Sequence, residues 1–177
     1  STSGKEFEQV IELLGRVKAD YDLPEALKLV LITNGSLIDR DSVQRGLSQM
    51  AIFNGEVWFK LDSVTREGRQ LINSTRMSFK KMRNNLQLSA SLCPTCLQTC
   101  VFQIDGMPPS RNESEAYLRF IEEFLSEGRV LEGVLLYGLA RPSLQPEGPR
   151  LTKIRQEWME AFSEQIRRRG LAVKLNP

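Results

Sequence analysis

A short apolar run near the start of the chain, KLVLITNG at Lys28–Gly35, constrains the fold more than any other stretch. Its central residues, Leu29 to Ile32, are consecutive strand formers and too few for a buried helix, which predicts a strand covered on both faces. The run ends in small polar residues, where the backbone must turn. These are Thr33, Asn34, Gly35 and Ser36. Because ligands in parallel α/β folds lie at the carboxyl ends of strands, this end is the first place to look for a site.

Helical and strand patterns alternate along the whole chain. Apolar residues at helical spacing predict helices, and short apolar or β-branched runs predict the strands between them. The expected helices cover 6–18, 39–50, 78–88, 113–127 and 151–169, and the expected strands cover 28–33, 57–62, 99–104, 130–137 and 171–175. We expect Asn112 to cap the fourth of these helices. Strict alternation with helices of crossover length predicts parallel strands joined by right-handed βαβ units.

The predicted fold is therefore of the α/β class, most simply a parallel, partial TIM-like (βα) barrel that forms one domain over 1–177. A doubly wound open sheet is the second possibility. The usual barrel has eight βα units, whereas this chain offers about five and begins with a helix. We therefore expect a barrel that is incomplete on its amino-terminal side, whose exposed sheet edge can pair with a second copy in a homodimer.

The composition of the chain excludes several kinds of chemistry. It contains no histidine, which removes the commonest general base, the Ser-His and Cys-His triads and most zinc sites. The 24 basic and 22 acidic residues nearly balance, so nucleic acid is not an expected partner. No stretch reaches transmembrane length, and Ser1–Glu8 is polar and acidic, so we expect a cytoplasmic protein with no membrane partner.

Three cysteines, Cys93, Cys96 and Cys100, lie close together in the sequence. An odd number of cysteines in a chain without a secretory segment does not suggest disulfides. The three thiols are one ligand short of a structural zinc site, although with a fourth ligand they can hold an auxiliary iron–sulfur cluster. Cys100 falls in an apolar strand, where a thiol behaves as a small apolar side chain. We therefore expect packing and loop cysteines rather than a metal site.

The ends of the expected strands carry an ordered set of short motifs. They are Thr33-Asn34-Gly35, Lys60-Leu61-Asp62-Ser63, Cys100–Gly106 with Asn112-Glu113-Ser114-Glu115, and Leu135-Leu136-Tyr137 with Arg141-Pro142. In this order and spacing, from about Glu6 to Val173, the sequence resembles the radical S-adenosylmethionine (radical SAM) enzymes, in the branch of iron–sulfur oxidoreductase-like proteins.

This resemblance implies the carboxyl-terminal part of a barrel whose complete form holds S-adenosylmethionine (SAM) and a 4Fe–4S cluster. Reductive cleavage of SAM at the cluster would start radical chemistry on an unknown substrate. Lys60 would pair with the methionine carboxylate of SAM, and Asn34 would lie near its ribose or carboxylate. Asp62, Gln103 and Arg141 would line the same mouth. The resemblance gives no catalytic residue.

The sequence departs from the family's pattern in two respects. The family's cluster motif is C-x3-C-x2-C near the amino terminus, whereas the cysteines here are spaced C-x2-C-x3-C and come late. A Gly-Gly-Glu-Pro segment should also precede the first helix, where Ser1–Gly4 stand instead. We therefore expect this chain to lack the cluster-bearing part, to be inactive alone and to bind neither the cluster nor SAM by itself.

Each of the implied site residues also has a structural interpretation. Asn34 can satisfy backbone groups in its turn, Lys60 can extend into solvent, and Asp62 can cap the next segment. Gln103 can be a buried hydrogen-bonding side chain, and Arg141 can tie down a loop. The alternative function is therefore a non-catalytic βα domain that binds a small anionic ligand or a protein partner at its strand ends.

Overall fold

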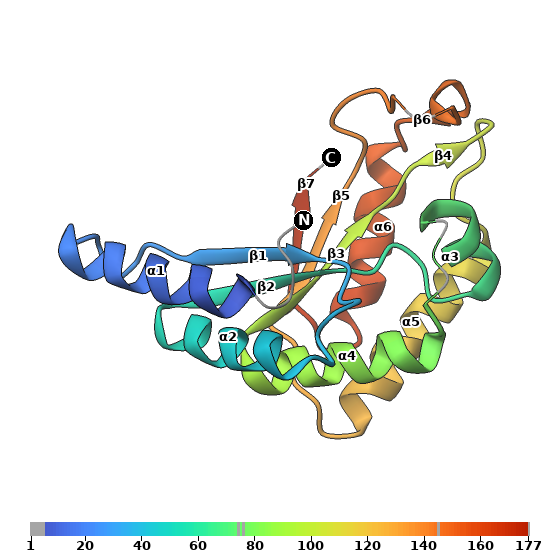
Figure 1. The fold of residues 1–177 in the computed structure, drawn as a ribbon. Coiled ribbons are helices and arrows are strands. Elements are labelled where there is room, and N and C mark those ends of the chain that lie inside the picture. Colours follow the sequence, from blue (N-terminus) through green and yellow to red (C-terminus); the bar gives the residue numbers. More distant parts are fainter. Residues whose placement is uncertain (1–5, 74, 76, 145, 177) are drawn as a thin grey trace. The chain divides into compact units, whose positions relative to one another are not determined.

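The computed structural model of the protein describes residues 6–73, 75, 77–144 and 146–176. This described part is an α/β fold with six α-helices and a five-stranded sheet in the order β1-β2-β3-β5-β7 (Figure 1). A separate two-stranded sheet pairs β4 with β6 in antiparallel orientation. None of the helices in the described ranges is long and apolar enough to cross a membrane.

The described residues form two compact units, which we treat separately. The first lies within Ser1–Lys60 and Met77–Cys96, and the second within Leu61–Arg76 and Leu97–Pro177. Strand β3 (Thr95–Cys100) therefore begins in the first unit and ends in the second.

The first unit is built on two parallel strands and three helices. These elements are α1 (Glu6–Asp20), β1 (Leu29–Thr33), α2 (Asp41–Ile52), β2 (Gly55–Lys60) and α4 (Phe79–Leu92). Helix α2 packs against α1, α4 and β2. The buried residues repeat at helical spacing in the helices and at every second position in β2, which gives this unit its core. They include Ile11, Val43, Leu47, Met50, Val57, Phe59, Met82 and Leu86.

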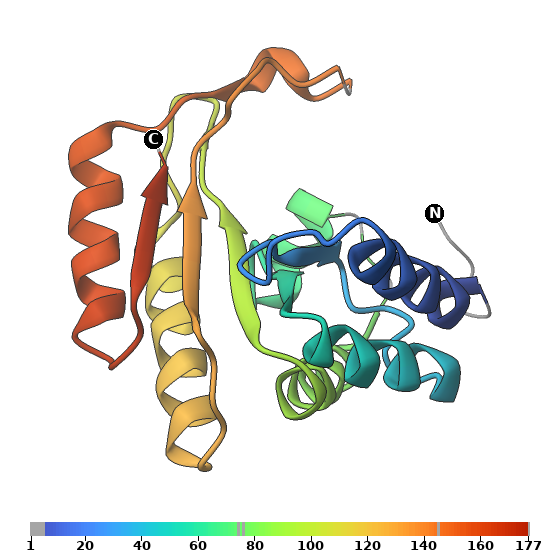
Figure 2. The same cartoon turned by 90° about the vertical axis from the view of Figure 1, so that its left-hand side faces the viewer.

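The second unit places two long helices beside parallel strands (Figure 2). Its remaining elements are α3 (Arg66–Asn73), β4 (Gln103–Ile104), α5 (Arg111–Ser126), β5 (Gly133–Tyr137), the 3-10 turn Gly148–Arg150, β6 (Leu151–Thr152), α6 (Gln156–Arg167) and β7 (Val173–Asn176). Strands β5 and β7 pair in parallel, and α6 packs against β7 and α5. The core residues are mainly large and apolar, among them Leu97, Leu118, Ile121, Phe124, Leu136, Met159 and Ile166.

The alternation of helices and strands confirms the predicted α/β class, and β1 pairs with β2 and β5 with β7 in parallel, as expected. The main sheet of the described part has five strands, which is consistent with part of a barrel. The incomplete barrel itself stays a prediction.

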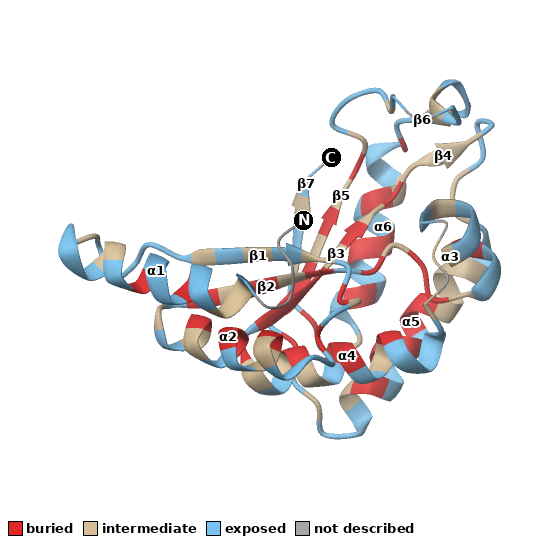
Figure 3. Cartoon of the chain, viewed as in Figure 1, coloured by how far each residue is buried: buried red, intermediate tan, exposed pale blue. Residues whose placement is uncertain are grey.

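Strand β1 differs from its prediction, because it is not covered on both faces. Its residues alternate between half-buried and exposed, and none of them is buried (Figure 3). Val30 and Ile32 are 43% and 53% exposed. The physical reason is missing cover: β1 packs mainly against its neighbour β2, and no helix in the described part of the chain packs closely on the face that carries these two side chains. A continuous apolar run therefore predicts a strand here, but not what covers it.

The third expected strand has different bounds from those predicted. It begins at Thr95 and ends at Cys100, so that Gln103 lies in the separate strand β4. The last expected helix also begins later than predicted, at Gln156. Both differences have the same cause, the antiparallel pairing of β4 with β6. The local pattern had assigned the residues of β4 to the preceding strand and those of β6 to the following helix.

The cap of the fourth expected helix was also predicted wrongly. Helix α5 begins at Arg111, and its cap is Ser110, whose Oγ accepts a hydrogen bond from the backbone N–H of Glu113 at 3.1 Å. Asn112 lies inside the first turn. Serine and asparagine are about equally good caps, so residue type alone does not choose between Ser110 and Asn112.

Candidate functional site

The polar end of β1 is a tight turn whose side chains bond to the turn's own backbone. Thr33 Oγ1 accepts a hydrogen bond from the Gly35 N–H, and Asn34 Oδ1 accepts one from the Ser36 N–H, both at 3.1 Å. Gly35 has a φ of 73°, and a Cβ at this position would meet the ring of Phe59 at 2.3 Å. The conformation of the turn therefore explains why Thr33, Asn34 and Gly35 stand here. As in the structural interpretation given above, the Asn34 side chain bonds to the backbone of its own turn.

Asn34 and Lys60 lie at neighbouring strand ends within the first unit. The parallel register places Thr33 opposite Phe59 as the last pair of β1 and β2, and Asn34 and Lys60 directly follow these two residues. Both side chains are exposed. The register thus places the backbones of these two predicted site residues side by side, at the end of the strands where ligands bind in parallel folds.

Asp62 is held by two segments of the second unit. Its Oδ1 accepts a hydrogen bond from the backbone N–H of Cys100 at 2.9 Å, and its Oδ2 accepts one from the side-chain amide of Asn73 at 2.8 Å. The side chain is half-buried. Asp62 therefore ties the segment after β2 to the end of β3 and to the last residue of α3.

Gln103 and Arg141 occupy different places in the second unit. Gln103 Oε1 accepts a hydrogen bond from the Thr152 hydroxyl at 3.1 Å, across the small sheet of β4 and β6. Arg141 is exposed on the segment that follows β5. Asp62 lines the cavity described below, Gln103 lines a hollow beside it, and Arg141 lines neither. The roles of these residues as cofactor ligands stay predictions.

A carboxylate that the sequence analysis missed holds the segment after Asp62 against α5. The Glu113 carboxylate accepts hydrogen bonds from the hydroxyls of Ser63 and Thr65, the second at 2.6 Å. Thr65 Oγ1 in turn accepts one from the Gly68 N–H at 2.9 Å. A Cβ at Gly68 would lie 2.2 Å from Ser63 Oγ. Ser63 and Glu113 both stand in the motifs quoted from the sequence, and the S-x-x-E pattern at Ser110–Glu113 marks a helix start, but none of these patterns predicts the network.

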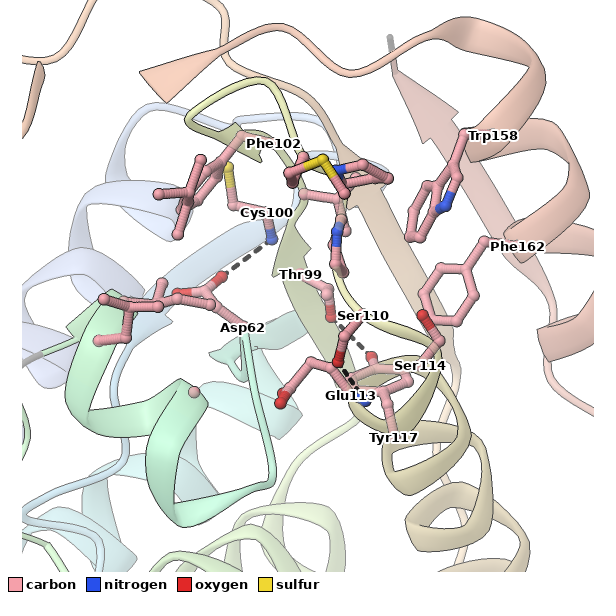
Figure 4. A pocket seen from close by; sticks show the side chains of 18 of the residues that line it. Asp62, Thr99, Cys100, Phe102, Ser110, Glu113, Ser114, Tyr117, Trp158 and Phe162 are labelled. Atoms are coloured by element: carbon pink, nitrogen blue, oxygen red, sulfur yellow. Dashed lines mark hydrogen bonds between the residues drawn. The ribbon is translucent and has the colours of Figure 1, made fainter. Parts of the chain in front are cut away.

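Beside this network the second unit contains a cavity of about 320 Å³ (Figure 4). Its walls come from α3, the end of β3, β4, the segment before α5, the first turns of α5, and α6, and most are apolar. Leu71, Ile72, Phe102, Met107, Trp158 and Phe162 are among them. The polar lining includes Asp62, Glu67, Thr99, Cys100, Glu113 and Tyr117. The cavity was not predicted, because its residues are spread over most of the chain and only the fold brings them together.

Two tyrosines near the cavity are held in their neutral form. Tyr117 is buried, and its hydroxyl lies 2.6 Å from that of Thr99, which itself donates a hydrogen bond to the Leu61 carbonyl at 3.0 Å. Burial raises the pKa of Tyr117 well above its ordinary value. Burial, followed by the nearby Cys100 and Asp62, does the same to the pKa of Tyr137. Because the Thr99 hydroxyl donates to Leu61, the neutral Tyr117 hydroxyl is the donor to Thr99.

The three cysteines are not bonded to one another as disulfides. The Cys93 thiol donates to the Gly55 carbonyl at 3.5 Å, and the Cys96 thiol donates to Glu56 Oε1 at 3.6 Å. Burial, with a smaller contribution from Glu56, raises the pKa of Cys93 from 9.0 to about 11. Within the described ranges, no three His, Cys, Asp or Glu side chains are grouped so that they can hold a metal ion.

Comparisons with known proteins find matches among solved structures alone. No family model and no curated protein matches the sequence. A domain of the pyruvate-formate lyase-activating enzyme from Bacteroides vulgatus matches with a TM-score of 0.67 at 12% identity, over 100% of this chain and 96% of that one. A radical SAM methyltransferase from Sphaerobacter thermophilus matches with a TM-score of 0.57 at 16% identity, over 82% of this chain and 39% of that one.

These identities are low, so the matches establish a shared fold. One of the two matched structures is a radical SAM methyltransferase, so the fold is one that the predicted resemblance leads us to expect. The chain spans 39% of the methyltransferase, so activities of such complete enzymes come to this chain only as proposals. Ser1–Gly4, where the sequence departs from the family's pattern, lie outside the described residues.

Proposed function

We propose that this chain is a domain of a radical SAM enzyme and that the carboxyl ends of its parallel strands help to hold SAM. One observation carries the proposal: Asn34 and Lys60 follow the last register pair of two parallel strands, in a fold shared with domains of radical SAM enzymes. In such folds, side chains at this end of the sheet face the ligand.

The donor groups at this position fit the carboxylate of SAM. The oxygen of Asn34 is already bonded to the Ser36 N–H. The amide nitrogen can therefore donate a hydrogen bond to a ligand. Lys60 carries an ammonium, which donates and never accepts. A carboxylate accepts from both groups, and its hydrogen bond with Lys60 is charge-assisted.

The described residues do not fit a 4Fe–4S cluster. They contain no grouping of three metal-ligating side chains, and the Cys93 thiol is buried against the Gly55 carbonyl. We therefore propose that the cluster, which supplies the electron for cleavage of SAM in this superfamily, is held by other residues and that the described part is inactive alone.

The test is SAM binding by the protein that carries this chain, after anaerobic reconstitution with iron and sulfide. We expect the substitution Lys60→Ala to weaken binding by about tenfold, which corresponds to the loss of one charge-assisted hydrogen bond. Lys80→Ala is the matched control, because Lys80 is an exposed lysine of α4 in the same unit. Equal SAM affinity in wild-type protein and Lys60→Ala would reject the proposal.

The absence of cluster ligands from the described residues also favours a second candidate, a non-catalytic domain that binds a small anionic ligand at the same strand ends. The iron content of the reconstituted protein separates the two candidates. Bound iron, with absorbance in the visible range, supports the enzyme. A folded protein that takes up no iron, yet binds a carboxylate through Lys60, supports the binding domain.

A further inference from the structure

We infer that the cavity of the second unit binds a small organic ammonium ion, namely a protonated primary amine on an aromatic or branched alkyl body. This inference goes beyond the proposed SAM site. The cavity is lined by residues of the second unit alone, and neither Asn34 nor Lys60 is among them. It needs no cluster and no second part of the protein.

The size and walls of the cavity suit a compact apolar body. Its volume of about 320 Å³ is at the lower end of the range of roughly 300–1,000 Å³ that small-molecule sites occupy. Trp158 and Phe162 lie next to each other, with ring centroids 5.0 Å apart, and both line the cavity. Aromatic faces give an apolar ligand a large contact area, and they also attract a cation.

The charges around the cavity have a single sign. Three carboxylates line it, those of Asp62, Glu67 and Glu113, and no lysine or arginine of the described part of the chain is among the lining residues. A partly enclosed site with this lining repels anions and attracts cations. The occupant should therefore carry a positive charge as well as an apolar body.

The three carboxylates differ in how readily they can accept a hydrogen bond from a ligand. Asp62 and Glu113 already accept hydrogen bonds from the chain, although a carboxylate has about four acceptor positions. Glu67 is exposed in the first turn of α3, so its side chain can turn toward a ligand without breaking the core. The hydroxyls of Thr99 and Tyr117 already bond to each other. The negative charge of Glu67 is therefore the one that a ligand can reach most easily, and it should make the cavity select cations over neutral compounds and anions.

The test uses 2-phenylethylammonium as the probe, with the neutral 2-phenylethanol and the anionic 3-phenylpropionate as matched compounds. Isothermal titration calorimetry on the 177-residue chain compares the three ligands at neutral pH. We expect the ammonium probe to bind about tenfold more tightly than the alcohol, because its hydrogen bond to a carboxylate is charge-assisted. Equal binding of the alcohol, tighter binding of the carboxylate, or no binding of the ammonium at millimolar concentration would overturn the inference.

The substitution Glu67→Gln tests the charge without changing the shape of the side chain. We expect it to weaken binding of the ammonium probe about five- to tenfold and to leave binding of the alcohol unchanged. Glu132→Gln is the control, since Glu132 is an exposed glutamate of the same unit that does not line the cavity. Ammonium binding that is the same in Glu67→Gln and Glu132→Gln would contradict the inference.

A second readout places the probe in the cavity rather than elsewhere on the chain. Cys100 lines the cavity, whereas Cys93 and Cys96 are 3% and 7% exposed and do not line it. Bound 2-phenylethylammonium should slow alkylation of Cys100 by iodoacetamide, as measured by mass spectrometry of the labelled peptide. Unchanged labelling at saturating probe would contradict the assignment. Because this experiment uses neither iron nor SAM, its failure leaves the proposed SAM site standing, and the reverse also holds.

Discussion

The turn at 33–36 and the segment at 62–65 both follow a parallel strand and are both polar, yet Thr33 and Asn34 bond within their own turn, whereas Asp62 and Ser63 also bond to residues far along the chain. In the turn, Thr33 and Asn34 accept hydrogen bonds from N–H groups two residues further along. In the segment, Asp62 bonds to Cys100, 38 residues away, and Ser63 bonds to Glu113, 50 residues away. The first set of bonds forms within a few residues of chain, and the second set requires the folded unit.

This difference separates two reasons for a polar residue at a strand end. A side chain that bonds to its own turn remains exposed and keeps part of its hydrogen-bonding capacity for a ligand, as Asn34 does. A side chain that bonds across the fold is covered by its partners: Ser63 is 1% exposed. Removing a partner then leaves a buried polar group without water or protein to bond to, which is costly. Replacing the long-range groups should therefore reduce stability much more than replacing the local ones.

The largest effect is expected for Glu113→Ala. The substitution removes the acceptor of the Ser63 and Thr65 hydroxyls, and we expect it to lower the free energy of unfolding by about 2–4 kcal/mol. Urea denaturation monitored by circular dichroism measures this change. Glu123→Ala is the control, because Glu123 is an exposed glutamate of the same helix with the same helix propensity. A loss no larger than that of the control would show that long-range bonding does not distinguish the two regions.

The pH dependence of Cys93 tests whether burial, rather than the unit in which a residue lies, causes the difference. Cys93 belongs to the first unit, like the turn, but its thiol is buried and bonds to Gly55, 38 residues away. Its pKa is about 11 in the folded chain against 9.0 for an ordinary cysteine. The neutral thiol is the form that the fold favours, so its contribution is fully present below pH 9 and is lost as the pH rises toward 11.

We therefore expect the stability of the wild-type chain relative to Cys93→Ala to fall by about 2 kcal/mol over this pH window. Taking the difference between the two proteins removes the titration of tyrosines and lysines that they share. Urea unfolding at pH 8, 9.5 and 10.5 measures it. A difference in stability that stays constant over these pH values would mean that Cys93 is not desolvated in the folded chain.

The same contrast explains what could be predicted from the sequence. The turn that contains Asn34 could be predicted from the sequence, because the hydrogen bonds of Thr33-Asn34-Gly35 form within the turn itself. The strands and helices were found for the same reason, since hydrophobic periodicity is a local property. The hydrogen bonds to Glu113, the cavity and the exposure of Val30 depend on which distant segments meet. No pattern within a short window of sequence contains that information, so these features emerged only from the fold.

The smallest effect is expected for Asn34→Ala, and it is the one that connects stability with function. The substitution removes one exposed hydrogen bond to the Ser36 N–H, and water can take its place, so we expect a loss of at most about 1 kcal/mol. Gly35 and Thr33 keep the turn closed, and circular dichroism should be unchanged. If the proposed SAM site is correct, the same variant weakens SAM binding in the reconstituted protein while it remains folded. A loss of stability as large as that of Glu113→Ala would instead make Asn34 part of the framework, and its position at the strand end would then be no evidence for a ligand.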